Sequence, residues 1–132
     1  MHGLMMNTPL LISSLIKYAS QYHSDTQIVT RTLEGSIRYT NFETLNERAK
    51  RLACGLLSFG IKSGDRIATL AWNTDRHLEL YYGISGIGAV CHTLNLRLSD
   101  EELIYIINHA EDRLLFFDNN LKSKVENIKP YL

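Results

Sequence analysis

The sequence contains few cysteines, few prolines and no excess of charge of either sign. Only 2 of its 132 residues are cysteine, and 14 basic residues balance 14 acidic ones. Cys54 and Cys91 fall in a predicted helix and a predicted strand, outside a CxxC spacing. We therefore expect reduced, buried thiols and a cytoplasmic protein. A net charge of zero argues against a nucleic-acid surface, because such a surface normally needs a basic excess.

Long hydrophobic runs are also missing. No stretch approaches the roughly 20 apolar residues of a membrane-spanning helix, so we expect no transmembrane segment. The run Leu10–Ile12 is short and lacks both a basic flank and a cleavage site, which argues against a signal peptide. With 45% hydrophobic and 21% charged residues, the composition is typical of about one globular domain. Peripheral contact with a membrane stays open.

The region from Gly60 to Asp118 changes its hydrophobic period several times and predicts the order strand, helix, strand, helix, strand. The strands are expected at residues 66–71, 89–94 and 114–117. The first helix should follow Asn73, with Leu78, Tyr81, Tyr82 and Ser85 at helical spacing. The second should begin at Ser99, where Glu102 completes a capping box. Strands separated by helices favour a parallel sheet with flanking helices, so the predicted fold class is α/β.

Further elements are predicted before and after this unit. A helix with an apolar face should begin at Thr8 and Pro9. Residues 27–33 and 36–40 predict a small N-terminal hairpin around Gly35. Thr40 and Glu43 have the form of a second capping box, which would open a long helix ending at Gly60. A last helix should follow Asn119 and Asn120.

Motifs that carry chemistry are nearly absent. Gly83, Gly86 and Gly88 have the wrong order for a dinucleotide fingerprint, and we interpret them as small residues for close helix-to-sheet packing and for a turn. There is no GxxxxGK[ST] loop. The histidines His77, His92 and His109 do not have the spacing of metal ligands, so no metal site is predicted. The tyrosine pair at positions 81 and 82 is expected to belong to the core and the layer around it, and the alternative is an aromatic lining for a ligand channel.

One long segment nevertheless resembles a known family. Residues 66–118, RIATLAWNTDRHLELYYGISGIGAVCHTLNLRLSDEELIYIINHAEDRLLFFD, are similar to the N-terminal portion of the AMP-forming acyl-CoA synthetases, the acyl-adenylate-forming family. The features that carry the likeness are the Gly64-Asp65-Arg66 turn, the Asn73 loop, Gly88-Ala89-Val90 and Leu94-Asn95-x-Arg97-Leu98. Trp72 with Arg76–Glu79, and Ile107–Asp112, resemble the medium- and long-chain fatty-acid CoA ligases in particular. The likeness covers roughly residues 9–128.

The resemblance implies that residues 1–132 are an N-terminal subdomain fragment of the AMP-binding domain. It also implies a two-step reaction, in which a fatty acid and Mg-ATP form an acyl-adenylate and the CoA thiol then displaces AMP. The cofactors of the full-length enzyme would be ATP, Mg²⁺ and CoA. The phosphate loop and the catalytic lysine of the family would lie after Leu132. We therefore expect this fragment to be inactive and to bind no cofactor by itself.

Arg97 is the one residue for which the resemblance implies a ligand. The corresponding arginine of some relatives lies near the CoA nucleotide phosphate, and a guanidinium suits such a bidentate contact. The alternative is a solvated arginine, or one paired with Asp100 or Glu101. The sequence departs from the family by having Leu96 where relatives usually have proline.

Another interpretation belongs to a different class of protein. The chain could be a stand-alone α/β module for binding or oligomerisation, because an apolar helix face at a chain end is a common dimer surface. An open reading frame that continues into a Ser/Thr/Gly-rich loop would favour the ligase. If the chain is a fragment of a larger body, we expect partly uncovered apolar faces on the first and fourth helices, and a homodimer as the simplest outcome. A flavodoxin-like receiver is less well supported, because clustered acidic residues are missing from the strand ends.

Overall fold

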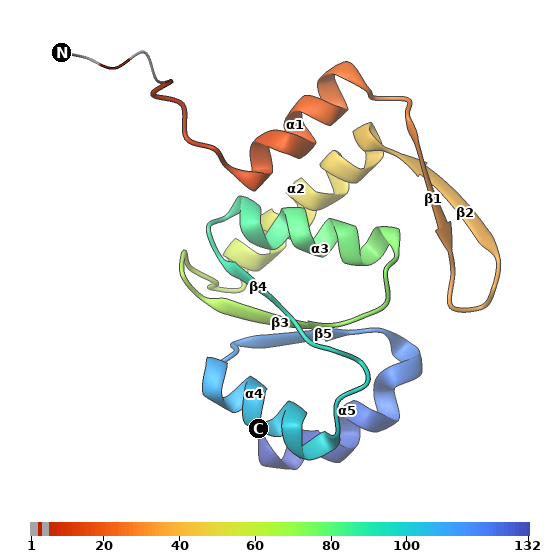
Figure 1. The fold of residues 1–132 in the computed structure, drawn as a ribbon, viewed down its shortest axis with the longest axis vertical. Helices are drawn as coiled ribbons and strands as arrows, with labels where there is room; N and C mark the ends of the chain where they lie inside the picture. The colour runs from red at the N-terminus through yellow and green to blue at the C-terminus, as the bar shows by residue number, and fades with distance from the viewer. Residues whose placement is uncertain (1–2, 4–5) are drawn as a thin grey trace.

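A three-stranded parallel sheet lies at the centre of the computed structural model, which describes residue 3 and residues 6–132 (Figure 1). The middle strand, β3 (Arg66–Leu70), is flanked by β4 (Val90–Thr93) and β5 (Leu114–Phe117). Both neighbours run parallel to β3, and Ile67 is in register with Cys91 on one side and with Leu114 on the other. The predicted α/β class and parallel sheet are confirmed.

Helices cover both faces of this sheet (Figure 1). On one face lie α1 (Ile12–Tyr22), α2 (Phe42–Ser58) and α3 (Asp75–Gly86). On the other lie α4 (Asp100–Ala110) and α5 (Lys122–Ile128), with 3₁₀ turns at Asn119–Leu121 and Lys129–Tyr131. An antiparallel hairpin of β1 (Gln27–Arg31) and β2 (Ile37–Asn41) stands beside α3, as the sequence predicts.

Each face of the sheet has its own hydrophobic core, because successive strand side chains point to opposite faces. The core on the α4 side comprises Ala68, Leu70, Leu94, Leu103, Ile107, Val125 and Ile128. The core on the α2 side comprises Leu56, Ile61, Ile67, Ile84 and Ala89. The central strand β3 thus contributes Ile67 to one core and Ala68 and Leu70 to the other, which joins the two layers into one body.

One of the two predicted capping boxes is confirmed. The Ser99 backbone N–H donates to Glu102 Oε2 at 2.8 Å, and this bond holds the pKa of Glu102 below its usual value. The box at Thr40 and Glu43 is wrong. Strand β2 extends through Asn41, which is paired with Gln27, and α2 begins at Phe42, so Asn41 is the N-cap and its Oδ1 accepts from the Thr44 N–H at 2.8 Å.

The first helix begins later than predicted and is poorly covered. It starts at Ile12 rather than at Pro9, and its N-cap residue Leu11 makes no side-chain hydrogen bond. Ile16 is its one buried residue, whereas Ile12 is 55% exposed and Leu15 is 62% exposed. The predicted apolar face therefore exists, and the described residues leave most of it uncovered.

Three expectations about α2 and α3 need correction. Gly83 packs against a helix and not against the sheet, because a Cβ there would lie 2.7 Å from Leu52 Cδ2. Tyr81 is not a core residue, since it is 37% exposed, and Tyr82 is half-buried. Cys54 is exposed on α2 rather than buried, although it is a free thiol as expected.

Within residue 3 and residues 6–132, no helix has the length and apolar character needed to cross a membrane.

Candidate functional site

The carboxyl ends of the parallel strands form the first candidate site. The chain leaves β3 toward α3 on one face of the sheet and leaves β4 toward α4 on the opposite face. Open α/β sheets bind ligands at such a point, where neighbouring connections diverge. The loops that follow these strands contain Trp72, Asn73 and Arg97. The topology therefore brings the sequence-predicted Arg97 to the same sheet edge as the Trp72 loop.

Asp118, at the end of β5, ties this edge together. Its Oδ2 accepts a hydrogen bond from the Trp72 backbone N–H at 2.7 Å, and its own N–H donates to the Leu70 carbonyl at 3.2 Å. The carboxylate thereby holds the loop after β3 against the end of β5. Trp72 is 45% exposed above this contact, so its indole is available to a ligand or to a neighbouring surface.

Arg97 lies in the turn between β4 and α4 and is exposed. Its backbone N–H donates to Asn95 Oδ1 at 3.0 Å, which orders the turn. Asp100 lies 3.8 Å from Lys124 Nζ, and the ion pairs within the described residues leave Arg97 out. Of the two alternatives to a ligand contact, a solvated side chain and an ion-paired one, the structure shows the solvated side chain. An unpaired guanidinium at the carboxyl edge remains free to bind an anion.

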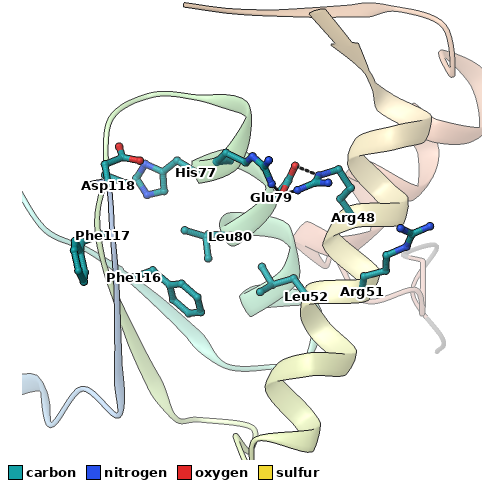
Figure 2. Close-up of a pocket in the computed structure, with 11 residues that line it drawn as sticks. Arg48, Arg51, Leu52, His77, Glu79, Leu80, Phe116, Phe117 and Asp118 are labelled. Carbon is teal, nitrogen blue, oxygen red and sulfur yellow. Dashed lines mark hydrogen bonds and ion pairs between the residues drawn. The ribbon is translucent and has the colours of Figure 1, made fainter. Parts of the chain in front are cut away.

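A second candidate site is a cavity of about 480 Å³ between α2, α3 and β5 (Figure 2). Its lining residues are Arg48, Arg51, Leu52, Ala71, Arg76, His77, Glu79, Leu80, Phe116, Phe117 and Asp118. Figure 2 shows Leu52, Leu80 and Phe116 pointing toward one another, with the Arg48 and Glu79 side chains above them. The cavity thus combines an apolar floor with charged groups along one side.

Two ion pairs fasten α3 to neighbouring elements, and sequence reasoning missed both. Glu79 on α3 accepts hydrogen bonds from Arg48 Nε and from Arg48 Nη2, the latter at 3.1 Å. Asp75 accepts from Arg38 of the hairpin, and this bond raises the pKa of the guanidinium. Both carboxylates are buried: Glu79 is 8% exposed and Asp75 is 6% exposed. No short-range pattern predicts them, because their partners lie 31 and 37 positions earlier in the chain.

His77 is buried next to these pairs and links α3 to the sheet. Its Nδ1 lies 3.2 Å from the Trp72 carbonyl oxygen, and its Nε2 lies 2.9 Å from Thr69 Oγ1. A carbonyl only accepts, so Nδ1 carries the proton and Nε2 accepts from the threonine hydroxyl. Burial lowers the pKa of His77, which favours this neutral form.

The three histidines named from the sequence are not brought together. His92 Nδ1 lies 2.7 Å from Asp112 Oδ2 and connects β4 to the turn before β5. His109 stacks on Tyr105 at a centroid distance of 5.5 Å, and His77 faces the other side of the sheet. Within residues 3 and 6–132, no group of three or more His, Cys, Asp or Glu side chains could hold a metal ion.

Comparison with known proteins gives one consistent result. The sequence model of the family described as "AMP-binding enzyme" matches residues 16–132. The chain is 52% identical over 132 residues to the 3-methylmercaptopropionyl-CoA ligase of Ruegeria pomeroyi, covering 100% of this chain and 24% of the relative. It is 43% identical over 119 residues to the medium-chain-fatty-acid–CoA ligase of Ectopseudomonas oleovorans, covering 90% of this chain and 22% of that relative.

A solved structure shows the same fold. The inhibitor-bound N-terminal domain of FACL13 from Mycobacterium tuberculosis superposes with a TM-score of 0.81 at 23% identity, covering 90% of this chain and 29% of that chain. The chain therefore spans about a quarter of the length of the relatives that it matches.

Proposed function

The chain belongs to the AMP-binding enzyme family, as a portion of its acyl-CoA ligase type, and on that premise we propose that the whole protein is an AMP-forming fatty-acid–CoA ligase. It would join a fatty acid to CoA through an acyl-adenylate, at the expense of ATP. The observation that carries the proposal is the 52% and 43% identity to two carboxylate–CoA ligases over nearly all of this chain.

The residues of this chain do not fit Mg-ATP by themselves. The sequence contains no glycine-rich loop for a triphosphate, and the described residues contain no cluster of metal ligands. In the proposed enzyme, ATP would supply the adenylyl group that activates the carboxylate, with pyrophosphate as the leaving group. The part of the protein outside residues 1–132 would hold that nucleotide. This chain would contribute the sheet edge that carries Trp72 and Arg97, together with the helices behind it.

Two measurements test whether the nucleotide site lies in the part of the protein outside residues 1–132. Isothermal titration of the 132-residue chain with ATP and magnesium should give no binding in the micromolar range, and the chain should form no acyl-CoA. The whole enzyme should release pyrophosphate when fatty acid and ATP are present. A micromolar dissociation constant for the chain alone would contradict the proposed division.

The relatives support two substrate classes. The relative with 43% identity is named for medium-chain fatty acids, and the relative with 52% identity is named for 3-methylmercaptopropionyl-CoA. We propose a fatty acid, and a short sulfur-containing carboxylate is the second candidate. Comparing kcat/KM of the whole enzyme for octanoate and for 3-methylmercaptopropionate decides between them. A preference of tenfold or more for the shorter acid would overturn the first choice.

Within the proposed enzyme, Arg97 is the candidate contact for a phosphate of CoA. Its exposure and its freedom from ion pairs among the described residues support this role. Arg97→Ala in the whole enzyme should raise the KM for CoA about tenfold or more, because a hydrogen bond to a charged group is worth about 1.5–3 kcal/mol. Adenylate formation, read as pyrophosphate release, should be unchanged. Arg31→Ala on the exposed face of the hairpin is the control, and an equal KM for both variants would remove the assignment.

The alternative of an association module has its own supporting observation. Ile12, Leu15 and Tyr22 of α1 are each more than half exposed, which favours contact with another apolar surface. The two free thiols fit a reducing compartment such as the cytoplasm. We propose a homodimer through helix α1. Sedimentation of the whole enzyme tests the dimer. A monomer at the highest concentration reached, with full ligase activity, would contradict it.

A further inference from the structure

The loop after β3 is held by hydrogen bonds on both sides of one residue, Trp72. Its backbone N–H donates to Asp118 Oδ2 at 2.7 Å, and its carbonyl oxygen lies 3.2 Å from His77 Nδ1. The carbonyl also accepts from the Thr74 N–H at 2.8 Å, which closes the turn within the loop itself. Asp118 therefore joins the loop to the end of β5, and His77 joins it to α3; both side chains are drawn in Figure 2.

The ring of His77 is itself fixed by its surroundings. Its Nε2 lies 2.9 Å from Thr69 Oγ1, and Tyr81 stacks on the ring at a centroid distance of 4.7 Å and an interplanar angle of 22°. Thr69 belongs to the central strand β3 and is 0% exposed. Because the threonine hydroxyl donates to Nε2, the proton of the neutral ring is on Nδ1. The bond to Thr69 thus selects the tautomer that donates to Trp72.

Packing alone does not account for an imidazole at this position. His77 is 5% exposed, and a buried polar group lowers stability unless its hydrogen bonds are made. An apolar side chain of similar size would fill the same space without that requirement. What the imidazole adds is the pair of bonds that connects the central strand to the loop carbonyl.

Trp72 lies at the edge of the sheet that carries the candidate CoA contact. Strand β3 stands between β4 and β5, so the loop after β3 neighbours the turn after β4 that contains Arg97. The indole of Trp72 is 45% exposed although its backbone is fixed at both the N–H and the carbonyl. An aromatic side chain held in this way presents a rigid surface to a ligand, and little freedom is lost on binding.

We infer that His77 is a positioning residue for CoA: its Nδ1–H holds the Trp72 carbonyl, and Trp72 presents its indole to the coenzyme beside Arg97. The inference rests on the proposed function, which assigns Arg97 to a phosphate of CoA. His77 is buried and does not touch the coenzyme, so it acts only through the loop. The competing explanation is a structural role, in which His77 only fills the space between α3 and the sheet.

Two substitutions of His77 separate its two ring bonds. The amide nitrogen of asparagine is as many bonds from the backbone as Nδ1, so His77→Asn can still donate to Trp72. The amide of glutamine reaches the position of Nε2, so His77→Gln keeps the bond to Thr69 and loses the bond to Trp72.

In the whole enzyme, His77→Gln should raise the KM for CoA about fivefold to tenfold, and kcat at saturating CoA should change much less. His77→Asn should restore a KM close to that of the wild type. His109→Gln is the matched control, because His109 is an exposed histidine on α4, and it should leave the KM where it was. An equal KM for His77→Gln and His77→Asn would mean that the bond to Trp72 has no part in CoA binding.

A double-mutant cycle tests whether His77 acts through Trp72. Trp72→Ala should itself raise the KM for CoA. Adding His77→Gln to Trp72→Ala should raise it no further, because both changes remove the same contact. Two effects that multiply would show that His77 acts by another route, and the inference would be wrong.

Fluorescence gives a readout that needs no activity. Trp72 is the only tryptophan of the 132-residue chain, so acrylamide quenching of that chain reports on this loop. Quenching should increase for His77→Gln and stay close to the wild type for His77→Asn, under conditions where urea denaturation shows both variants to be folded. Equal quenching of the two variants would contradict the positioning role, whatever their stabilities.

Failure of the proposed function would look different. A whole protein without ligase activity on any carboxylate would contradict that function, and quenching of the two variants would still decide whether His77 positions Trp72. An active ligase in which both variants have the same KM for CoA would overturn the inference alone.

Discussion

The two faces of the central sheet are built on different physical principles. The face covered by α4 and α5 is closed, with a core of seven buried apolar residues and a helix whose first turn is capped by its own sequence. The face covered by α1, α2 and α3 buries Asp75, His77 and Glu79 beside its apolar core. It also carries the exposed apolar side chains of α1, the cavity of Figure 2 and an apolar groove between α2 and β5.

This difference shows that the two faces of the sheet are stabilised by different kinds of interaction. The α4 face depends on hydrophobic burial, which needs no precise partner, and its helix is capped by residues only three positions apart. The α3 face depends in addition on ion pairs between residues more than 30 positions apart. The first face is closed by apolar packing, whereas the second also buries charged groups and leaves apolar residues of α1 exposed.

The largest effect is expected on the closed face. Leu103 of α4 is 0% exposed, so Leu103→Ala removes buried side-chain volume and should lower the free energy of unfolding by about 2–5 kcal/mol. Urea denaturation of the 132-residue chain measures it. Tyr105→Ala on the same helix is the control, because Tyr105 is 66% exposed, and it should cost under about 0.5 kcal/mol. Equal costs for the two variants would mean that this core is not closed.

A smaller loss of stability is expected on the face covered by α1, α2 and α3. Glu79→Gln keeps the shape of the side chain and leaves Arg48 without a counter-charge. Breaking a fully buried pair costs about 3–5 kcal/mol, but the Arg48 side chain is 38% exposed, so we expect about 1–2 kcal/mol.

The matched control for this variant is Glu47→Gln. Glu47 pairs with Arg51 at 3.9 Å on the exposed side of α2, the helix that carries Arg48, and the loss there should be a few tenths of a kcal/mol, within the range of about 0.2–0.5 for such pairs. Denaturation of both variants in the same buffer gives the comparison. A loss for Glu79→Gln as small as the control would show that the α2–α3 contact does not depend on this ion pair.

The smallest effect concerns pH and sharpens the same comparison. Burial lowers the pKa of His77 below its ordinary value of 6.5, so the unfolded chain binds a proton at a pH where the folded chain does not. Stability should therefore fall as the pH decreases through about 6.5, by at most about 1.4 kcal/mol per pH unit. His77→Gln should flatten this slope below about pH 6.5. An unchanged slope would assign it to other groups.

Much of the fold could be predicted because its signals are local. The three strands, the hairpin around Gly35 and the Ser99 capping box each depend on residues within a few positions of one another. The box at Thr40 failed because strand β2 extends one residue further, to Asn41, and Asn41 caps the helix that follows it directly. Arg97 could be named from a resemblance, and the topology then brought it to the same edge as Trp72.

The buried polar face of α3 could not be predicted from periodicity. Its residues Leu78 and Tyr81 suggested one buried side, whereas the buried residues of α3 include Asp75, His77 and Glu79. Each carboxylate is buried because an arginine from another element meets it. That compensation depends on where the hairpin and α2 lie in space.

The sequence by itself determined the order of the elements, the parallel sheet and the family, because these depend on short-range patterns and on segments that match relatives. The tertiary structure alone decided which charges are buried and that the described residues leave most of the apolar face of α1 uncovered. The physical reason is distance along the chain: hydrophobic period and capping act within a few residues. Ion pairs, grooves and exposed strands arise only when segments tens of residues apart pack together.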